Sequence, residues 1–242
     1  MLRALVLLLA LAGCAGAPKG LSSAAEGRIA GRAIVTAEGD PAEARRAAAQ
    51  FGNPTPWTAP LFGAAVSVLG DFSESSRTRV GAVPVPERDP TRTARAAIVD
   101  YLVTEFHAVR GGRAFDAAGI TATTPAARAR ALFERAQAQG FPGVIVDLQP
   151  RSFRVRSAGV WTGLRVERFY LDYDADLLVV DAADGAVLAQ GACAAESRAA
   201  PFTLAELEAR GMALLDAAAD LVARQCAAQL IQSRLLPKAG PA

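Results

Sequence analysis

The clearest candidate for a metal or ligand site is a group of three aspartates. Asp172, Asp174 and Asp176 alternate along one segment. In a strand, alternate side chains lie on the same face, and clustered carboxylates are ligands that Ca²⁺ prefers. Calcium loops of this spacing need a glycine turn and a later glutamate, and this segment has neither. Arg154 and Arg156 alternate in the same way on a neighbouring predicted strand. We therefore expect a ladder of cross-strand ion pairs on a solvated sheet face and no metal site.

The chain offers few candidates for a catalytic base, because His107 is its one histidine. A serine or cysteine nucleophile would need this histidine as its base and a carboxylate to orient it. The helix predicted here places His107 on its polar side, and no Gly-x-Ser-x-Gly nucleophile motif occurs in the chain. We expect a solvated surface histidine, no catalytic residue and no cofactor.

Two tryptophans are the candidates for partner binding. Trp57 and Trp161 fall in segments predicted to be irregular or turns, and exposed aromatic side chains in loops can anchor a partner protein. The alternative is that each ring covers an edge of the core. Coverage of the core is the interpretation we prefer, with partner binding as the second.

The amino-terminal residues carry a different kind of chemistry. Arg3 precedes an unbroken apolar run, Ala4–Leu11, which ends in small residues before Cys14. This pattern is typical of a secretory signal peptide, and the run is shorter than the roughly 20 residues that span a bilayer. The four residues Leu11–Cys14 resemble the bacterial lipobox, in which the cysteine is diacylated and becomes the mature first residue. The alternative is an ordinary signal peptide followed by a chance cysteine.

The lipobox resemblance implies a location. Ala15, rather than aspartate, follows Cys14. By similarity to lipoproteins of Gram-negative bacteria, this favours the periplasmic face of the outer membrane over retention at the inner membrane. Residues 14–31 are rich in small residues and glycine, which predicts a lipidated, flexible tether.

The two remaining cysteines, Cys193 and Cys226, form an even number in an oxidising compartment, which indicates one disulfide. Two buried free thiols or a metal pair are the alternatives. Cys226 lies within the apolar stripe of the last predicted helix, and Cys193 lies just beyond the strand that this stripe should cover.

The charge balance excludes one class of partner. The formal net charge is +2 at pH 7, whereas nucleic-acid binding needs a strongly basic surface. Such a small charge also excludes strong attraction to anionic lipids. No apolar run after residue 14 approaches the length of a membrane span, so we expect membrane contact through lipid alone.

Hydrophobic periodicity and capping residues predict the helices. Residues 98–104 are rich in strand formers, yet apolar positions recur at helical spacing over about 90–109, and this periodicity favours a helix. A further helix should begin at Thr124 and end at Gly140. A capping box beginning at Thr203 predicts the last helix, which should run as one element to about residue 230.

The predicted strands cover residues 64–69, 144–155, 164–180 and 186–190, with an Asp-Gly hairpin turn before the last. The pattern predicts an α+β two-layer sandwich, an antiparallel meander of three to five strands with helices packed on one face. The expected organisation is a signal peptide (1–13), the tether (14–31), a short helix and irregular segment (32–63), a single periplasmic domain (64–236) and a disordered tail (237–242).

The predicted order of elements from about residue 64 resembles that of a loose class of periplasmic modules. The hairpin from Asp181 to Leu188 reads D-x-x-x-G-x-V-L, as in that class. The class includes the amino-terminal domain of the translocation protein TolB, YajG-type lipoproteins and lipoproteins that activate penicillin-binding proteins. The segment Val144–Leu188 also looks like the core of small alphaproteobacterial lipoproteins. The resemblance implies fold and compartment, and no functional residues carry over because the class has no shared site.

Three functions are compatible with these features. The first is a non-enzymatic outer-membrane lipoprotein that binds an unidentified envelope protein. The second is a transport-auxiliary lipoprotein that hands a lipid or substrate to an envelope complex, which an apolar cavity between sheet and helices would favour. The third is an enzyme acting on cell-wall material, which paired carboxylates in a cleft would favour.

Overall fold

The computed structural model describes residues 19–38, 86, 88–122, 124–158 and 168–236. Its strands form a mixed sheet in the order β2–β1–β4–β5–β6, and β3 also pairs with β1. The strands are β1 (Ala33–Glu38), β2 (Val109–Arg110), β3 (Phe115–Asp116), β4 (Val144–Ala158), β5 (Arg168–Asp181) and β6 (Val187–Glu196). The helices are α2 (Ser23–Ile29), α5 (Pro90–Phe106), α6 (Pro125–Gln139), α7 (Leu204–Arg210) and α8 (Met212–Leu230), with a 3₁₀ turn η1 (Ser197–Ala199) and a π-helical turn η2 (Ile231–Leu235).

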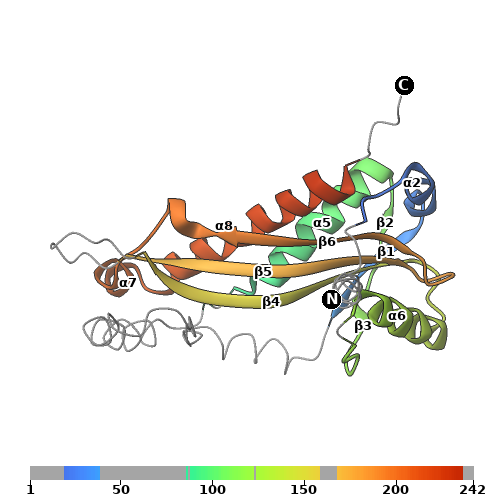
Figure 1. Cartoon of the computed structure of the whole chain (residues 1–242), viewed down its shortest axis with the longest axis horizontal. Helices are drawn as coiled ribbons and strands as arrows, with labels where there is room; N and C mark the ends of the chain where they lie inside the picture. The colour runs from blue at the N-terminus through green and yellow to red at the C-terminus, as the bar shows by residue number, and fades with distance from the viewer. Residues whose placement is uncertain (1–18, 39–85, 87, 123, 159–167, 237–242) are drawn as a thin grey trace, which may run out of the picture.

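The antiparallel meander of β4, β5 and β6 is confirmed, and these long strands run side by side along the molecule (Figure 1). The predicted Asp-Gly turn closes the β5–β6 hairpin. Gly185 has a φ of +76°, a conformation that favours glycine. The backbone N–H of Asp181 donates to the carbonyl of Ala186 at 2.9 Å, which ends the ladder.

β1 corrects the expectation of a short helix and irregular segment over residues 32–63 in its first part, because Ala33–Glu38 forms a strand. Residues 39–63 lie outside the described residues. β1 runs parallel to β4, with Ile34 opposite Val144, so the sheet is mixed and not a purely antiparallel meander. The physical reason is burial on both faces, as parallel strands require. Ile34 is 1% exposed in one core and Val35 is 7% exposed in the other.

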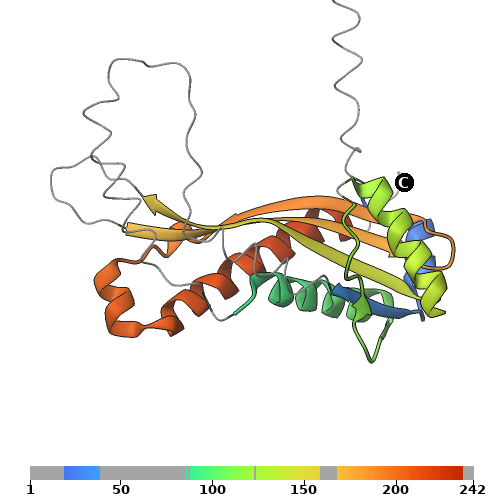
Figure 2. The same ribbon diagram turned by 90° about the horizontal axis from the view of Figure 1, so that it is seen from below.

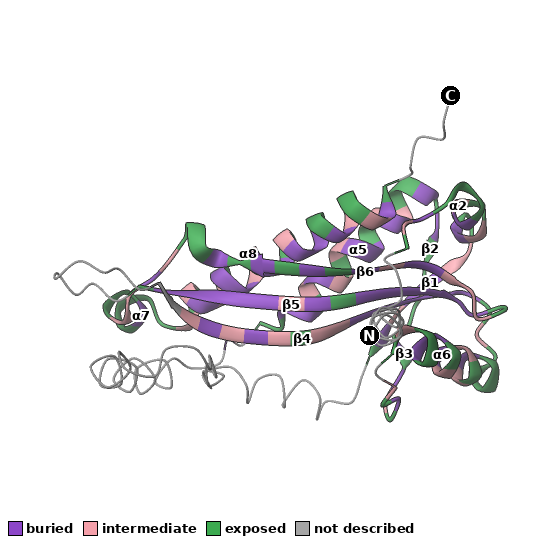
Figure 3. Cartoon of the chain, in the orientation of Figure 1, coloured by how far each residue is buried: buried purple, intermediate pink, exposed green. Residues whose placement is uncertain are grey.

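The helices cover both faces of the sheet, so the expectation of helices on one face is wrong. α5 and α8 pack together against one face (Figure 2), whereas α6 packs against the other. β5 explains the difference, because Leu177 and Val179 enter the first core and Leu178 and Val180 the second. Such a continuous apolar run is typical of a strand buried on both sides, and Figure 3 shows β5 buried along most of its length.

The segment predicted as a helix over about 90–109 is α5. The side chain of Asp89 caps it by accepting a hydrogen bond from the Thr91 N–H at 2.8 Å, and Ile98 and Leu102 are fully buried. α6 is also confirmed, with Thr124 as its N-cap and a left-handed Gly140 as its C-cap.

The last predicted helix is divided in two. The capping box of Thr203 and Glu206 is present at the start of α7. At Gly211, however, φ is +59° and ψ is −149°, so α7 ends and α8 begins. An L side chain rarely adopts this conformation, and an apolar stripe that continues on both sides of Gly211 does not reveal the break.

The tether prediction is wrong for the described residues of 14–31, because these fold against the domain. Leu21 is 1% exposed and Ile29 is fully buried, and the side chain of Ser22 caps α2 by accepting from the Ala25 N–H. Leu21, Ala25 and Ile29 recur at a spacing of four residues, a helical apolar stripe that the small-residue composition conceals. Residues 14–18, the strand expected at 64–69 and the tail at 237–242 lie outside the described residues.

Candidate functional site

The disulfide between Cys193 and Cys226 is confirmed, with its Cα atoms 5.2 Å apart. Cys226 lies on the buried side of α8, and Cys193 lies within β6 instead of just beyond it. Gln229, one turn after Cys226, reinforces the same junction. Its side-chain amide accepts from the N–H of Ala194 at 3.1 Å and donates to the carbonyl of Ala194 at 2.9 Å. The disulfide and this amide therefore hold α8 to β6, the edge strand.

The ladder of charged side chains on β4 and β5, which we call the charged strip, is confirmed as a set of ion pairs. Asp172 accepts from Arg156 Nε at 2.6 Å and from an Arg154 guanidinium N–H at 3.2 Å. Asp174 accepts from the Ser152 hydroxyl at 2.7 Å. Among the described residues, no group of three possible metal ligands gathers here or elsewhere. Arginine side chains balance the charge of these carboxylates, and the Ser152 hydroxyl adds a hydrogen bond.

The strip is only partly solvated, and Asp172 is its most buried carboxylate. The Asp172 side chain is 6% exposed, whereas that of Arg156 is 40% exposed. The aliphatic parts of arginine side chains can cover a surface while the charged ends stay in water, and the two arginines shield Asp172 in this way. The hydrogen bond to Asp172 raises the pKa of the Arg156 guanidinium.

Asp176, at the other end of the strip, has a looser environment. Its carboxylate lies 3.4 Å from Arg151 Nε, and both side chains are about half exposed. Partial burial raises the pKa of the Asp176 carboxyl, although the Arg151 charge opposes this shift. A raised aspartate pKa beside paired carboxylates carries no catalytic assignment on its own.

A buried ion pair links α6 to β4. Arg128 Nε donates to Asp147 at 2.6 Å, and the two side chains are 6% and 2% exposed. Arg128 also donates to the backbone carbonyl of Ile120 at 2.6 Å. Sequence reasoning missed this pair, although an aspartate inside the apolar run Val144–Leu148 is a signal that a buried cation must face it. The pair attaches α6 to the sheet and leaves no charge free there.

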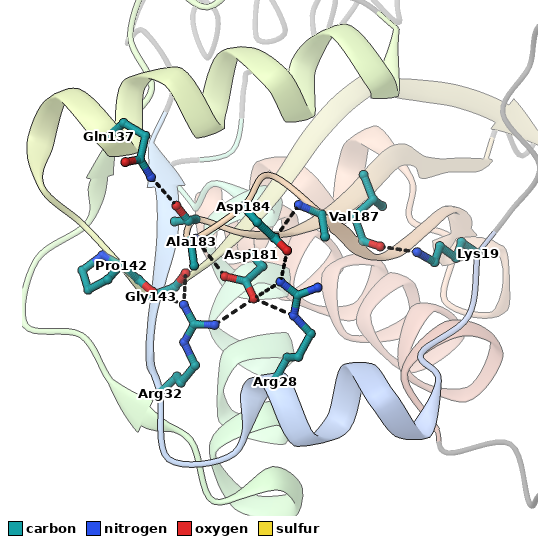
Figure 4. Close-up of polar contacts among 12 residues, drawn as sticks. Lys19, Arg28, Arg32, Gln137, Pro142, Gly143, Asp181, Ala183, Asp184 and Val187 are labelled. Atoms are coloured by element: carbon teal, nitrogen blue, oxygen red, sulfur yellow. Dashed lines mark hydrogen bonds and ion pairs between the residues drawn. The ribbon is translucent and has the colours of Figure 1, made fainter.

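A second ionic cluster joins the amino-terminal segment to the β5–β6 hairpin, and Figure 4 shows its side chains converging. We call it the clasp: Arg28, Arg32, Asp181 and Asp184. The Asp181 carboxylate is fully buried and accepts from Arg28 Nε at 2.8 Å and from Arg32 at 2.7 Å. Arg28 also pairs with Asp184 at 2.5 Å. This hydrogen bond from Arg28 lowers the pKa of the Asp184 carboxyl.

Backbone hydrogen bonds fix the segment that leads into the clasp. The N–H of Lys19 donates to the carbonyl of Gln190 at 3.1 Å, and the N–H of Gln190 donates back at 2.8 Å. The Lys19 ammonium group also donates to the carbonyl of Val187 (Figure 4). Two residues later, the N–H of Leu21 donates to the carbonyl of Arg234 in η2 at 2.7 Å. The chain is therefore attached to the edge of β6 at Lys19 and to η2 at Leu21.

The other predicted site residues are the histidine, the lipidated cysteine and the two tryptophans. His107 is exposed and ends α5 in a left-handed conformation, with φ of +53°. Its carbonyl accepts from the Gly31 N–H at 3.2 Å. Cys14, Trp57 and Trp161 lie outside the described residues, so lipidation and partner binding at these positions stay predictions. Within the described residues, no helix combines the length and apolar character needed to cross a membrane.

Comparisons with known proteins do not assign the chain to a family. No family model and no curated protein matches it. Among solved structures, the lipoprotein GNA1162 from Neisseria meningitidis matches with a TM-score of 0.25 and 14% identity, over 78% of this chain and 96% of that one. The PelC dodecamer from Paraburkholderia phytofirmans matches with a TM-score of 0.21 and 13% identity, over 79% and 89%. Likenesses of this strength carry no argument about function.

Proposed function

We propose that this chain is a lipid-anchored protein of the bacterial outer membrane that acts without catalysis, by binding an envelope protein on the periplasmic side. The observation that carries the proposal is the position of Cys14, which follows an apolar run and small residues and lies five residues before Lys19. A diacylated cysteine with its many buried CH₂ groups, each contributing about 0.8 kcal/mol, holds a protein on a membrane without a spanning helix.

The charge pairing supports a binding role over an enzymatic one. In the charged strip and the clasp, four carboxylates accept from arginine or hydroxyl groups of the same cluster: Asp172, Asp174, Asp181 and Asp184. Asp176 is half exposed and lies 3.4 Å from Arg151 Nε. General acid–base catalysis needs a carboxyl group that can meet a substrate and exchange its proton. Side chains engaged with one another stabilise a surface and are poorly placed for that exchange.

The anchor is tested by the mass of the mature amino terminus. An acylated peptide beginning at Cys14 is the expected result, and Cys14→Ala should release the protein from membranes at high salt. The matched control is the double variant Cys193→Ala, Cys226→Ala, which should stay membrane-bound because those residues lie in the folded domain. A Cys14→Ala protein that still sediments with membranes would contradict the anchor.

The membrane and the partner need separate measurements. Density separation of envelopes should place the native protein with the outer membrane, and Ala15→Asp should move it to the inner membrane. Tagged lipidated protein isolated from envelopes in mild detergent should carry a defined envelope protein in constant ratio. If it is recovered alone under several mild conditions, the binding role is wrong even though the anchor stands.

A further inference from the structure

The distance between the anchor and the fold is short. Lys19 is held by two backbone hydrogen bonds to Gln190, of 3.1 and 2.8 Å. Cys14 lies only five residues earlier, and five residues at roughly 3.6 Å each span at most about 18 Å. A lipid on Cys14 therefore stays within that distance of the point where the chain joins β6.

The molecule is much longer than this reach. β5 has 14 residues, and at about 3.3 Å per residue it extends roughly 45 Å. The β5–β6 hairpin, α2 and the carboxyl-terminal end of α8 lie at one end, and α7 lies at the other (Figure 1). Residues 19–21, which we call the arm, attach to β6 and η2 at the first of these ends. This end, which we call the anchor end, is therefore the only part of the described fold that a lipid on Cys14 must keep near the membrane.

The anchor end also carries exposed apolar side chains. Among the described residues, the exposed large hydrophobics are Val109, 56% exposed, and Leu236, 47% exposed. The N–H of Val109 donates to the carbonyl of Arg32, just after α2, at 2.9 Å. Leu236 directly follows η2, in which the carbonyl of Arg234 accepts from Leu21. Both apolar side chains thus lie at the end that the short arm fixes.

We infer that the anchor end faces the phospholipid headgroups, with Val109, Leu236 and the exposed Lys19 at the lipid surface, and that α7 points away from the membrane. This orientation rests on the proposed lipid at Cys14. Apolar side chains near a cation fit the boundary between headgroups and acyl chains. The part of the charged strip that includes Asp172 lies nine residues along β5 from the hairpin, so it is held off the bilayer, where an envelope protein can reach it.

The orientation can be measured with one fluorophore at a time. In the lipidated protein, Cys14 is acylated and Cys193 and Cys226 form a disulfide, so an introduced cysteine supplies the reactive thiol. Ala24→Cys labels the exposed face of α2, and Glu208→Cys labels the exposed face of α7. Each labelled protein is bound to vesicles of phosphatidylethanolamine and phosphatidylglycerol that contain a headgroup-spin-labelled lipid, a short-range quencher.

We expect quenching several-fold stronger at Ala24 than at Glu208. Equal quenching, or stronger quenching at Glu208, would overturn the orientation. Flotation of the same vesicles separates the two proposals: protein that does not float shows that the anchor is absent, whereas floating protein with the wrong quenching pattern shows that only the orientation is wrong.

A second variant tests the lipid contact itself. Replacing Val109 and Leu236 by serine should leave flotation unchanged, because the acyl chains dominate binding, but should reduce quenching at Ala24. Both side chains are exposed, so the variant should keep its fold, which circular dichroism checks. Unchanged quenching would show that these side chains do not touch the bilayer and would overturn that part of the inference.

Discussion

Asp181→Asn is the sharpest test of the clasp. Asp181 is fully buried and receives Arg28 and Arg32, whose side chains are 36% and 28% exposed. Asparagine keeps one oxygen for the N–H of Ala183, which donates to Asp181 Oδ1 at 2.9 Å. The other oxygen becomes an NH₂ group that faces two guanidinium donors. Removing one partner of a fully buried pair costs about 3–5 kcal/mol. Because both arginines reach water, we expect a loss of about 2–4 kcal/mol here.

The assay is urea unfolding of the chain without residues 1–13 and with Cys14→Ser, its disulfide kept oxidised. The midpoint should fall while the m value stays constant, and the amides of Lys19 and Leu21 should exchange faster as the arm loosens. Asp184→Asn is the matched control, since the Asp184 side chain is 54% exposed and its pair should contribute less than about 1 kcal/mol. Equal effects at the two positions would refute the view that the clasp depends on the buried carboxylate.

Three further perturbations test other parts of the fold. Replacing both Cys193 and Cys226 by alanine should lower the free energy of unfolding by about 3 kcal/mol, since a loop of 33 residues is opened; a loss below about 1 kcal/mol in urea unfolding would contradict this. Gly143→Ala should destabilise the fold by about 1–3 kcal/mol, because the added methyl group would meet a backbone carbonyl of β1. Gly27→Ala is the control, since nothing lies near its Cβ position, and it should stabilise α2 by up to about 1 kcal/mol. Similar changes in unfolding free energy for both would refute the close approach of Gly143 to β1. The raised pKa of Asp176 means that its charged form is disfavoured in the fold, so Asp176→Asn should raise Tm at neutral pH. The gain in Tm should vanish as the pH falls below the ordinary aspartate pKa, where the carboxyl is protonated in both states. A gain that persists in acid would contradict this link between the pKa and stability.

Local signals predicted the local structure well. The caps at Thr124 and Thr203 lie where the sequence indicates, because a cap depends on residues within one turn. The disulfide was predicted from cysteine parity and from the position of Cys226 in an apolar stripe. Both inferences need only the redox compartment and one helix face.

The clasp could not be predicted in the same way. Asp181 has the sequence context of an ordinary hairpin residue, and its arginine partners lie 153 and 149 residues away. Nothing local distinguishes these two arginines from the others in the chain. Buried Leu21 and Ile29 did leave a signal in their spacing, but the small residues around them also fit a flexible linker.

In the charged strip, residue spacing predicts part of the arrangement of the charged side chains. Alternation predicts which side chains share a face, and Arg154 does lie opposite Asp172. Alternation does not predict that the register shifts between Pro150 and Ser152, although a proline inside a predicted strand is a known mark of a bulge. The shift separates Arg151, which pairs with half-exposed Asp176, from the residues that cover Asp172. Alternation therefore predicts which carboxylates share a face, whereas the shielding of Asp172 and the half exposure of Asp176 depend on which arginines reach them in the folded sheet.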